Sequence, residues 1–254
     1  MDQLTNTPLL LFAVTLAATS LASAAGLWLR SRAPLSSGAQ QDDFDKIATA
    51  TLTLLALIIG FSFSLAASRY DQRKNLEEEE ANAIGTEFLR ADVLPPADAA
   101  NVRRLLVAYL DQRILYFTNA DATQLGRINQ RTNQLQDQLW KAVRGPEAAE
   151  STPAMALALS GMNDVINSNG YSQAARVNRI PTAAWYLMAV IAVGANVLLG
   201  YGTENPKGWS RLAYVLPLLI SISFLLIADM DSPEQGLIRV NPVNLQSLAA
   251  SLKG

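Results

Sequence analysis

The sequence contains no cysteine and no histidine. Without cysteine the chain can form no disulfide, no thiol nucleophile and no thiolate metal site. Without histidine it lacks the commonest general base and the commonest metal ligand. Nothing in the sequence brings a pair of carboxylates into one cleft either. We therefore predict that the protein is not an enzyme and that it binds neither a cofactor nor a metal.

Charge is scarce in four parts of the chain. The net charge is −2, so no basic surface for nucleic acid is expected. Segments 8–29, 47–67, 183–201 and 212–228 are uncharged and apolar. At about 1.5 Å per residue, the 21 residues of segment 47–67 cross the roughly 30 Å core of a bilayer as a helix. We predict four transmembrane helices, joined in the first pair by a connector at 30–46.

The first apolar segment has an alternative interpretation as a cleaved signal peptide. Its apolar run is long for a signal peptide, and no Lys or Arg precedes it. We therefore interpret segment 8–29 as a true span, with Trp28 at the membrane interface.

The middle of the chain, 68–182, has an ordinary polar composition with apolar residues at helical spacing. The helix of the second span is expected to continue to about residue 94, where Pro95 and Pro96 end it. Three further amphipathic helices follow. The predicted fold is an all-α membrane protein with a helical cytoplasmic domain inserted between the second and third spans. Residues 229–254 are expected to form a polar cytoplasmic tail, broken by Pro233, Gly236 and Pro242.

Four spans place both termini and the helical domain on the same side of the membrane. Lys and Arg near the membrane are almost balanced between the two sides, so charge alone barely decides the orientation. We predict that the termini and the domain are cytoplasmic.

The stretch 47–81 joins the second span directly to a densely charged helix. Read as a helix, Thr53, Leu57, Phe61 and Ser64 lie on one stripe. Hydroxyl groups and apolar rings suit the wall of an ion pore, although the same residues also suit packing between helices. In the third span, Gly194, Ala195 and Gly200 allow close contact with another helix.

Charged residues continue this helix beyond the membrane. The acidic run 77–80 points all round a helix, which favours a solvated surface paired with Arg73 and Lys74 one turn back. The alternative is that Glu77 and Glu80, or Glu80 alone, line a vestibule or hold a neighbouring subunit. Arg69 and Glu80 are our candidates for such a vestibule or stem.

Two further polar features flank the later spans. Asn196 in the third span requires a partner, either across a helix interface or along an ion path. Asp229, Asp231, Glu234 and Gly236 follow the fourth span, where carboxylate oxygens can bind a hard cation. Their spacing does not match an EF-hand, so we predict a turn that ends the helix.

These residues give the chain a family resemblance. Gly60-Phe61, then Arg69-Tyr70, the segment 80–86 (EANAIGT), Trp185 and the turn from Asp231 to Gly236 resemble bacterial bestrophin-like membrane proteins. The resemblance implies a pentameric, mostly anion-selective channel whose termini are cytoplasmic and whose second span lines an apolar neck. Carried over by the Gly-Phe and Arg-aromatic pairs, the three neck rings are Phe61, Leu57 and Thr53.

The sequence departs from that family pattern in two ways. Thr53 is polar and Leu57 is smaller than the aromatic residue expected there. The acidic cluster after the fourth span is thinner than the calcium sites of animal bestrophins, so calcium gating is not predicted.

The function predicted from the sequence is therefore an oligomeric, anion-conducting channel of the bacterial inner membrane. Its expected partners are the lipid bilayer, further copies of the chain as a pentamer, and permeant ions. The alternative is a non-conducting membrane scaffold or sensor whose cytoplasmic helices bind a partner.

Overall fold

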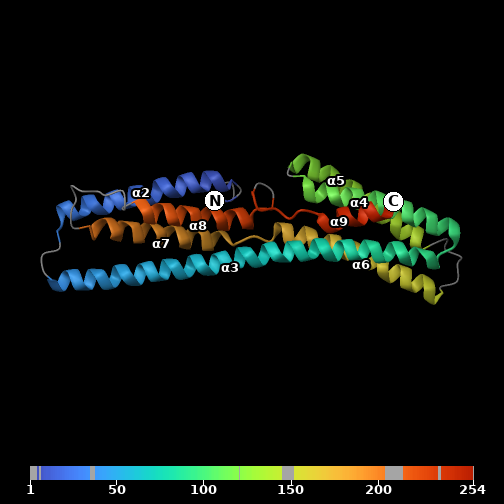
Figure 1. Ribbon diagram of the computed structural model, residues 1–254, viewed down its shortest axis with the longest axis horizontal. Helices are drawn as coiled ribbons and strands as arrows, with labels where there is room; N and C mark the ends of the chain where they lie inside the picture. Colours follow the sequence, from blue (N-terminus) through green and yellow to red (C-terminus); the bar gives the residue numbers. More distant parts are fainter. Residues whose placement is uncertain are drawn as a thin grey trace. The chain divides into compact units, whose positions relative to one another are not determined.

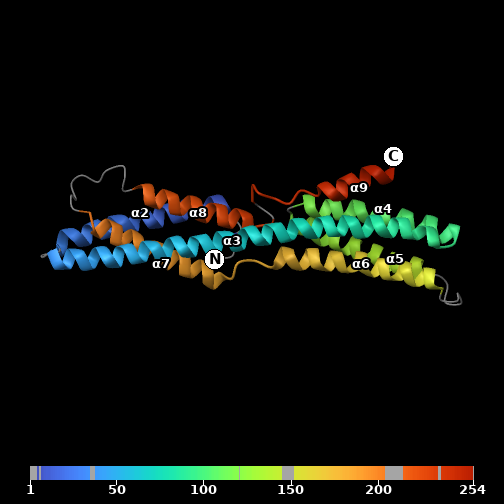
Figure 2. The same ribbon diagram turned by 60° about the horizontal axis from the view of Figure 1, so that its bottom comes forward.

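The computed structural model describes residues 5, 7–34, 38–119, 121–144, 152–203, 214–233 and 236–253 (Figures 1 and 2). Helices are the only regular elements in these ranges, which confirms the all-helical prediction. The chain divides into two compact units. The first comprises Met1–Arg69 and Arg179–Ile238, and the second comprises Tyr70–Asn178 and Arg239–Gly254.

The first unit is built from apolar helices. It contains α2 (Pro8–Arg32), the first part of α3 (Gly38–Arg90), α7 (Thr182–Tyr201) and α8 (Val215–Asp231). Helix α2 packs against both α7 and α8, and the two views show these three helices side by side. The rings of Trp185 and Phe224 meet edge to face at 6.1 Å in the core of this unit, where Leu55 and Ala66 of α3 are also buried.

Three stretches of helix are long and apolar enough to cross a membrane: Pro8–Arg32, Gly38–Val93 and Met155–Tyr201, the last of which includes α7. The predicted spans 8–29, 47–67 and 183–201 fall within α2, α3 and α7. Helix α8 has 17 residues and covers the predicted fourth span from residue 215 onward, while positions 212 and 213 lie outside the described residues. The arrangement of four spans stays a prediction.

The prediction of a connector loop at 30–46 is wrong for most of these residues, which are helical. Helix α2 continues to Arg32, and α3 already begins at Gly38. Asp42, Asp43 and Asp45 therefore lie inside α3, beyond its first turn.

The second unit is a bundle around one apolar core. It contains α3 from Tyr70 onward, the short 3₁₀-helix η1 (Ala91–Val93), α4 (Pro96–Thr118), α5 (Ala122–Arg144), α6 (Pro153–Val177) and α9 (Val243–Lys253). Helix α4 packs against α5 and α9, and α5 packs against α6. The fully buried core side chains include Ile84, Leu106, Leu139, Met162 and Leu245. As predicted, Pro95 and Pro96 separate α3 from the next long helix.

The polar tail expected after residue 228 needs correction. Helix α8 runs on to Asp231, and residues 243–253 form α9, whose Leu245 and Ala249 are buried in the core of the second unit. Leu245, Leu248, Ala249 and Leu252 recur at helical spacing, which is the pattern of a helix with one buried face. The helix breakers at 233, 236 and 242 lie before this pattern and do not interrupt it.

Candidate functional site

The predicted stripe of α3 lies on the outer surface of the first unit. Leu57 is 52% exposed and Phe61 is 67% exposed, and Thr53 and Ser64 are exposed as well. The residues of α3 that are buried here are Leu55, Ser62 and Ala66. At about 100° per residue, these three lie on the opposite side of the helix from the stripe. The stripe therefore points away from the chain's own helices.

The Thr53 hydroxyl on this stripe is already engaged. Its Oγ1 donates to the Thr49 carbonyl at 2.8 Å, one helical turn earlier. Because the proton is used within the helix, position 53 of the stripe presents the methyl group and the oxygen lone pairs of Thr53 and does not offer its hydroxyl proton.

A groove of about 610 Å³ runs between α3 and α8 beside the stripe. Leu55, Ile59 and Phe63 of α3 line one side, and Leu219 and Ser223 of α8 line the other. The Ser223 hydroxyl donates to the Leu219 carbonyl at 2.8 Å, so the lining is apolar in effect. The exposed part of α3 is thus flanked by a second apolar surface.

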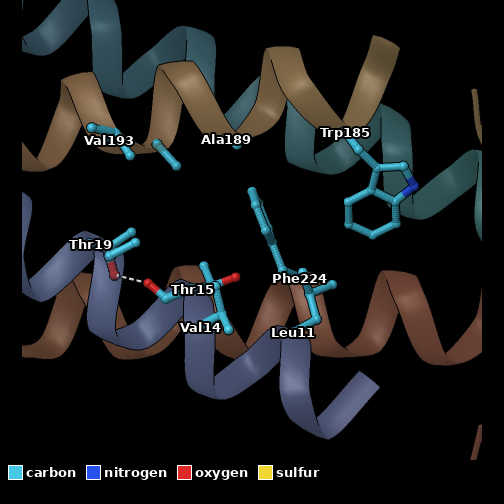
Figure 3. A pocket seen from close by; sticks show the side chains of 10 residues that line it. Leu11, Val14, Thr15, Thr19, Trp185, Ala189, Val193 and Phe224 are labelled. Carbon is cyan, nitrogen blue, oxygen red and sulfur yellow. Dashed lines mark hydrogen bonds between the residues drawn. The ribbon is translucent and has the colours of Figure 1, made fainter. Parts of the chain in front are cut away.

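A smaller cavity of about 110 Å³ lies between α2, α7 and α8 (Figure 3). Leu11, Trp185, Val193 and Phe224 lie around it, and the Thr19 hydroxyl is turned to the Thr15 carbonyl at 2.7 Å. Because the exposed surface of its lining is almost entirely apolar, this cavity is a packing space in the first unit.

Asn196 binds across the interface between α7 and α2. Its side-chain amide donates to the Ala192 carbonyl at 2.8 Å, and its Oδ1 accepts from the Ser23 hydroxyl at 3.3 Å. The requirement for a partner is confirmed, and the helix interface is the alternative that holds.

One turn from this hydrogen bond, α2 and α7 meet backbone to backbone. A Cβ on Gly26 would overlap the Val197 carbonyl oxygen, and one on Gly200 would overlap the Ser23 carbonyl oxygen. Close contact at Gly200 is therefore confirmed, whereas none of the described residues outside α7 lies within 4 Å of a Cβ built on Gly194.

The acidic run contains two kinds of residue. Glu78 and Glu79 are exposed, but Glu77 is 1% exposed and Glu80 is fully buried in the second unit. The interpretation of the whole run as a solvated surface is therefore wrong. Positions 77 and 80 are three residues apart on α3 and share the face that packs into the bundle.

Glu80 forms a buried ion pair with Arg113 of α4. Both side chains are fully enclosed, the Arg113 Nε and Nη2 groups donate to the two carboxylate oxygens, and the Ser172 hydroxyl donates to Oε2 at 3.0 Å. Burial lowers the pKa of the Arg113 guanidinium, but the Glu80 charge and hydrogen bond outweigh it, so that this pKa lies above its ordinary value. Glu80 is thus enclosed by its own chain, which argues against a vestibule role. Arg69, the other candidate, is half-buried at the end of the first unit.

Glu77 binds the start of α9. Its Oε1 accepts from the Leu245 backbone N–H at 2.9 Å, and its Oε2 accepts from the Asn244 side chain at 2.7 Å. The first turn of a helix has N–H groups without helical partners and carries positive partial charge. Glu77 therefore caps α9 from a different helix.

The predicted turn after α8 is present. Asp229 accepts from the backbone N–H groups of Leu237 at 2.6 Å and Ile238 at 2.8 Å. A Cβ on Gly236 would lie 2.5 Å from the Asp229 carbonyl oxygen, so the turn requires glycine there. Asp231 accepts from the Ile180 N–H at 3.0 Å and lies 3.5 Å from Arg179.

The carboxylates of this turn thus accept hydrogen bonds from backbone N–H groups. Glu234 lies outside the described residues. Among the residues that are described, no group of three or more acidic side chains is close enough to hold a metal ion. The hydrogen bonds account for Asp229 and Asp231 as the end of a helix.

A protein-family model and several solved structures match this chain. A family model described as a bestrophin-like domain matches residues 14–245. Matching solved structures include a bacterial bestrophin homologue from Klebsiella pneumoniae, with 17% identity, a TM-score of 0.62, and coverage of 96% of this chain and 95% of that chain. A single-residue variant of such a Klebsiella pneumoniae homologue matches with 15% identity, a TM-score of 0.64, and coverage of 97% and 96%. No curated protein sequence matches the chain.

Proposed function

Because the chain belongs to the bestrophin-like family, whose members are known as ion channels, we propose that it forms an oligomeric, anion-conducting channel in which α3 lines an apolar neck. The observation that carries the proposal is the exposed stripe of α3. An isolated apolar stripe opposite the buried face of its own helix either contacts lipid or contacts other copies of the chain. In a ring of copies with α3 innermost, Thr53, Leu57, Phe61 and Ser64 would form successive rings around one axis.

The proposed assembly is a pentamer in the bacterial inner membrane. Helices α2, α3, α7 and α8 are its four spans, and the termini and the helical unit lie in the cytoplasm. The apolar groove between α3 and α8 supports this arrangement, since an adjacent copy is an apolar occupant for it. The bilayer covers the remaining apolar surface of α2, α7 and α8.

The neck acts by its apolar rings. Rings of Leu57 and Phe61 exclude water at a narrow diameter, so that ion passage depends on the width of the neck. Ser64 and Thr53 lie on either side of these rings. Because the Thr53 hydroxyl proton is donated within α3, Thr53 affects the width of the neck and does not donate a hydrogen bond to a passing anion.

The proposal is tested by ion flux in liposomes that contain the purified chain. We expect halide flux that exceeds alkali-cation flux, and we expect Phe61→Ala to raise it several-fold because the narrowest ring is removed. Phe63→Ala is the matched control: it removes the same side chain two residues away, where Phe63 lines the groove toward α8.

Two outcomes contradict the proposal. Equal increases in Phe61→Ala and Phe63→Ala would mean that the stripe only packs between helices. A verified oligomer that passes neither halides nor alkali cations would leave a non-conducting membrane scaffold as the function.

A further inference from the structure

The second unit buries a carboxyl group that its own fold does not satisfy. Glu87 of α3 is fully buried, and neither of its carboxylate oxygens has a hydrogen-bond partner. A buried ionised carboxylate without a donor is strongly unfavourable, so such a group either stays neutral or finds a partner. Nothing in the proposed channel uses this residue.

The carboxyl group lies where α3 and α6 approach each other closely. Gly161 of α6 faces it, and a Cβ at that position would overlap both Glu87 Oε2 and Arg90 Nη1. The same Cβ would lie 3.1 Å from Arg90 Cδ. The missing side chain of Gly161 thus makes room for one acidic and one basic side chain of α3.

Arg90 stands between two carboxyl groups. Its Nη1 lies 3.9 Å from Oδ2 of Asp164 on α6, and Asp164 is 62% exposed. Glu87 lies three residues before Arg90 on α3, so their side chains are neighbours on the same face of that helix. The Arg90 guanidinium can therefore pair with Asp164 on α6 or with Glu87 on its own helix. Pairing with Glu87 breaks the contact with α6.

Burial, more than the charged groups around it, moves the titration of Glu87 toward neutral pH. Burial raises the pKa of Glu87 to about 7, Arg90 lowers it, and Asp164 raises it. Of the other charged groups nearby, Asp92 on η1 and Arg103 on α4 pair with each other. With no histidine in the chain, this carboxyl group is a means of responding to pH close to 7.

We propose that Glu87 is a proton-controlled latch between α3 and α6. When it is neutral, it stays buried over Gly161 while Arg90 holds Asp164. When it loses its proton, the carboxylate takes Arg90 for itself, the pair with Asp164 breaks, and α6 loosens from α3. The latch acts within the second unit and is independent of whether the chain conducts ions.

The latch is tested by a distance between the two helices at two pH values. Since the chain has no cysteine, Leu89→Cys on α3 and Leu157→Cys on α6 give two specific sites for spin labels, and both positions are exposed. Labelled chain diluted with unlabelled chain reports the distance within one copy. We expect a narrow distance distribution at about pH 5.5 and a broader, longer one at about pH 8.5, with a midpoint near pH 7.

Variants of the latch residues separate its parts. Glu87→Gln keeps the shape and removes the titration, so the distribution should stay narrow at both pH values. The infrared band of a neutral carboxyl group that titrates near pH 7 in the unaltered chain should be absent from Glu87→Gln. Asp164→Asn should move the midpoint of that band to lower pH, because a charge that raises the pKa is gone. Asp137→Asn, an exposed acid on α5, is the control and should change neither signal.

The proposal is overturned if the distance is the same at both pH values in the unaltered chain. It is equally overturned if the pH response persists in Glu87→Gln, or if a neutral carboxyl band that titrates near pH 7 is present in that variant.

Discussion

Two buried carboxylates of the second unit bind partners that are far away in the sequence. Glu80 pairs with Arg113, which lies 33 residues later, and Glu77 binds Leu245, which lies 168 residues later. Each carboxylate therefore ties α3 to another helix of the bundle. The neighbouring exposed residues Glu78 and Glu79 have no such function.

Replacing one member of the buried pair should destabilise the protein strongly. Glu80→Gln leaves the Arg113 guanidinium charged, buried and without its counter-ion, which costs about 3 kcal/mol or more. We expect a markedly lower midpoint of thermal denaturation for the purified chain in detergent. The control is Asp111→Asn, which breaks a pair with Lys253 whose members are 48% and 53% exposed. That change should cost below about 1 kcal/mol, and equal effects of the two variants would contradict the argument.

Some side-chain contacts could be predicted from the sequence, and others could not. The hydrogen bonding of Asn196 and the turn formed by Asp229 were predictable, because a buried polar side chain must find a hydrogen-bond donor or acceptor close by. The burial of Glu80 and Glu87 was missed. It depends on Arg113 and Gly161, whose positions only the folded bundle defines. The buried residues 77, 80, 84 and 87 do recur at helical spacing, which is the signal that could have found them.

Among the elements, α9 depends on a cap supplied by α3. Glu77→Gln removes the negative charge at the first turn of α9 and leaves one acceptor oxygen for two donors. We expect the Leu245 amide to exchange with solvent several-fold faster, which corresponds to about 1 kcal/mol of local stability. Hydrogen exchange followed by mass spectrometry measures this directly. Glu78→Gln, its exposed neighbour, should leave the exchange of α9 unchanged, and faster exchange in that variant would count against the cap.

The contact of α2 with α7 depends on two glycines. Gly26→Val places a branched side chain against the Val197 carbonyl oxygen and 2.7 Å or less from the backbone of α7. Overpacking of this kind typically costs about 1–3 kcal/mol, and the helices must separate to relieve it. We expect a lower thermal midpoint in detergent and a smaller yield of folded protein. Gly194→Val is the matched control, since that position faces open space; comparable losses in both variants would contradict the proposed contact.

Helices were largely predictable from the sequence, and their ends less so. Uncharged runs and the Pro95-Pro96 pair identify α2, α3, α7 and the boundary before α4. The early start of α3 was missed, because Ser, Gly and Asp around residues 36–45 are typical of a loop as well as of a first helical turn. Helix α9 was missed because three helix breakers precede its short apolar pattern.

For the whole molecule, the stability should fall as the pH rises toward neutrality. Glu87 has a pKa of about 7 in the folded chain against an ordinary value of 4.5. Between these values the folded chain holds a proton that the unfolded chain has lost, so the free energy of unfolding decreases with pH in this window. The loss of stability is complete above about pH 7, where the folded chain has given up this proton as well.

Thermal denaturation of the full chain as a function of pH measures this effect. Stability should drop between about pH 4.5 and 7, and Glu87→Gln should flatten that part of the profile. An unchanged slope in the variant would assign the pH dependence to other carboxyl groups.

Membership of a family was predictable from short motifs spread over the chain. Gly60-Phe61, Arg69-Tyr70 and the turn up to Gly236 indicated it, and the family model covers residues 14–245. The orientation in the membrane and the number of copies in the assembly could not be predicted in the same way. They depend on a small excess of positive charge and on contacts between chains, which one sequence defines poorly.

The cap on α9 also fixes an order of events during synthesis. Glu77 and Leu245 are 168 residues apart, so at about 5–20 residues per second the ribosome makes the partner of this carboxylate roughly 10 to 30 seconds after the carboxylate itself. Helices α4, α5 and α6 are translated first in that interval, and α7 and α8 follow them. Leu245 comes 68 residues after Val177, the last residue of α6, which takes roughly 3 to 14 seconds at the same rate. During that time the nascent bundle has α3 to α6 and still lacks α9, so chaperones and proteases can bind the surface that α9 later covers.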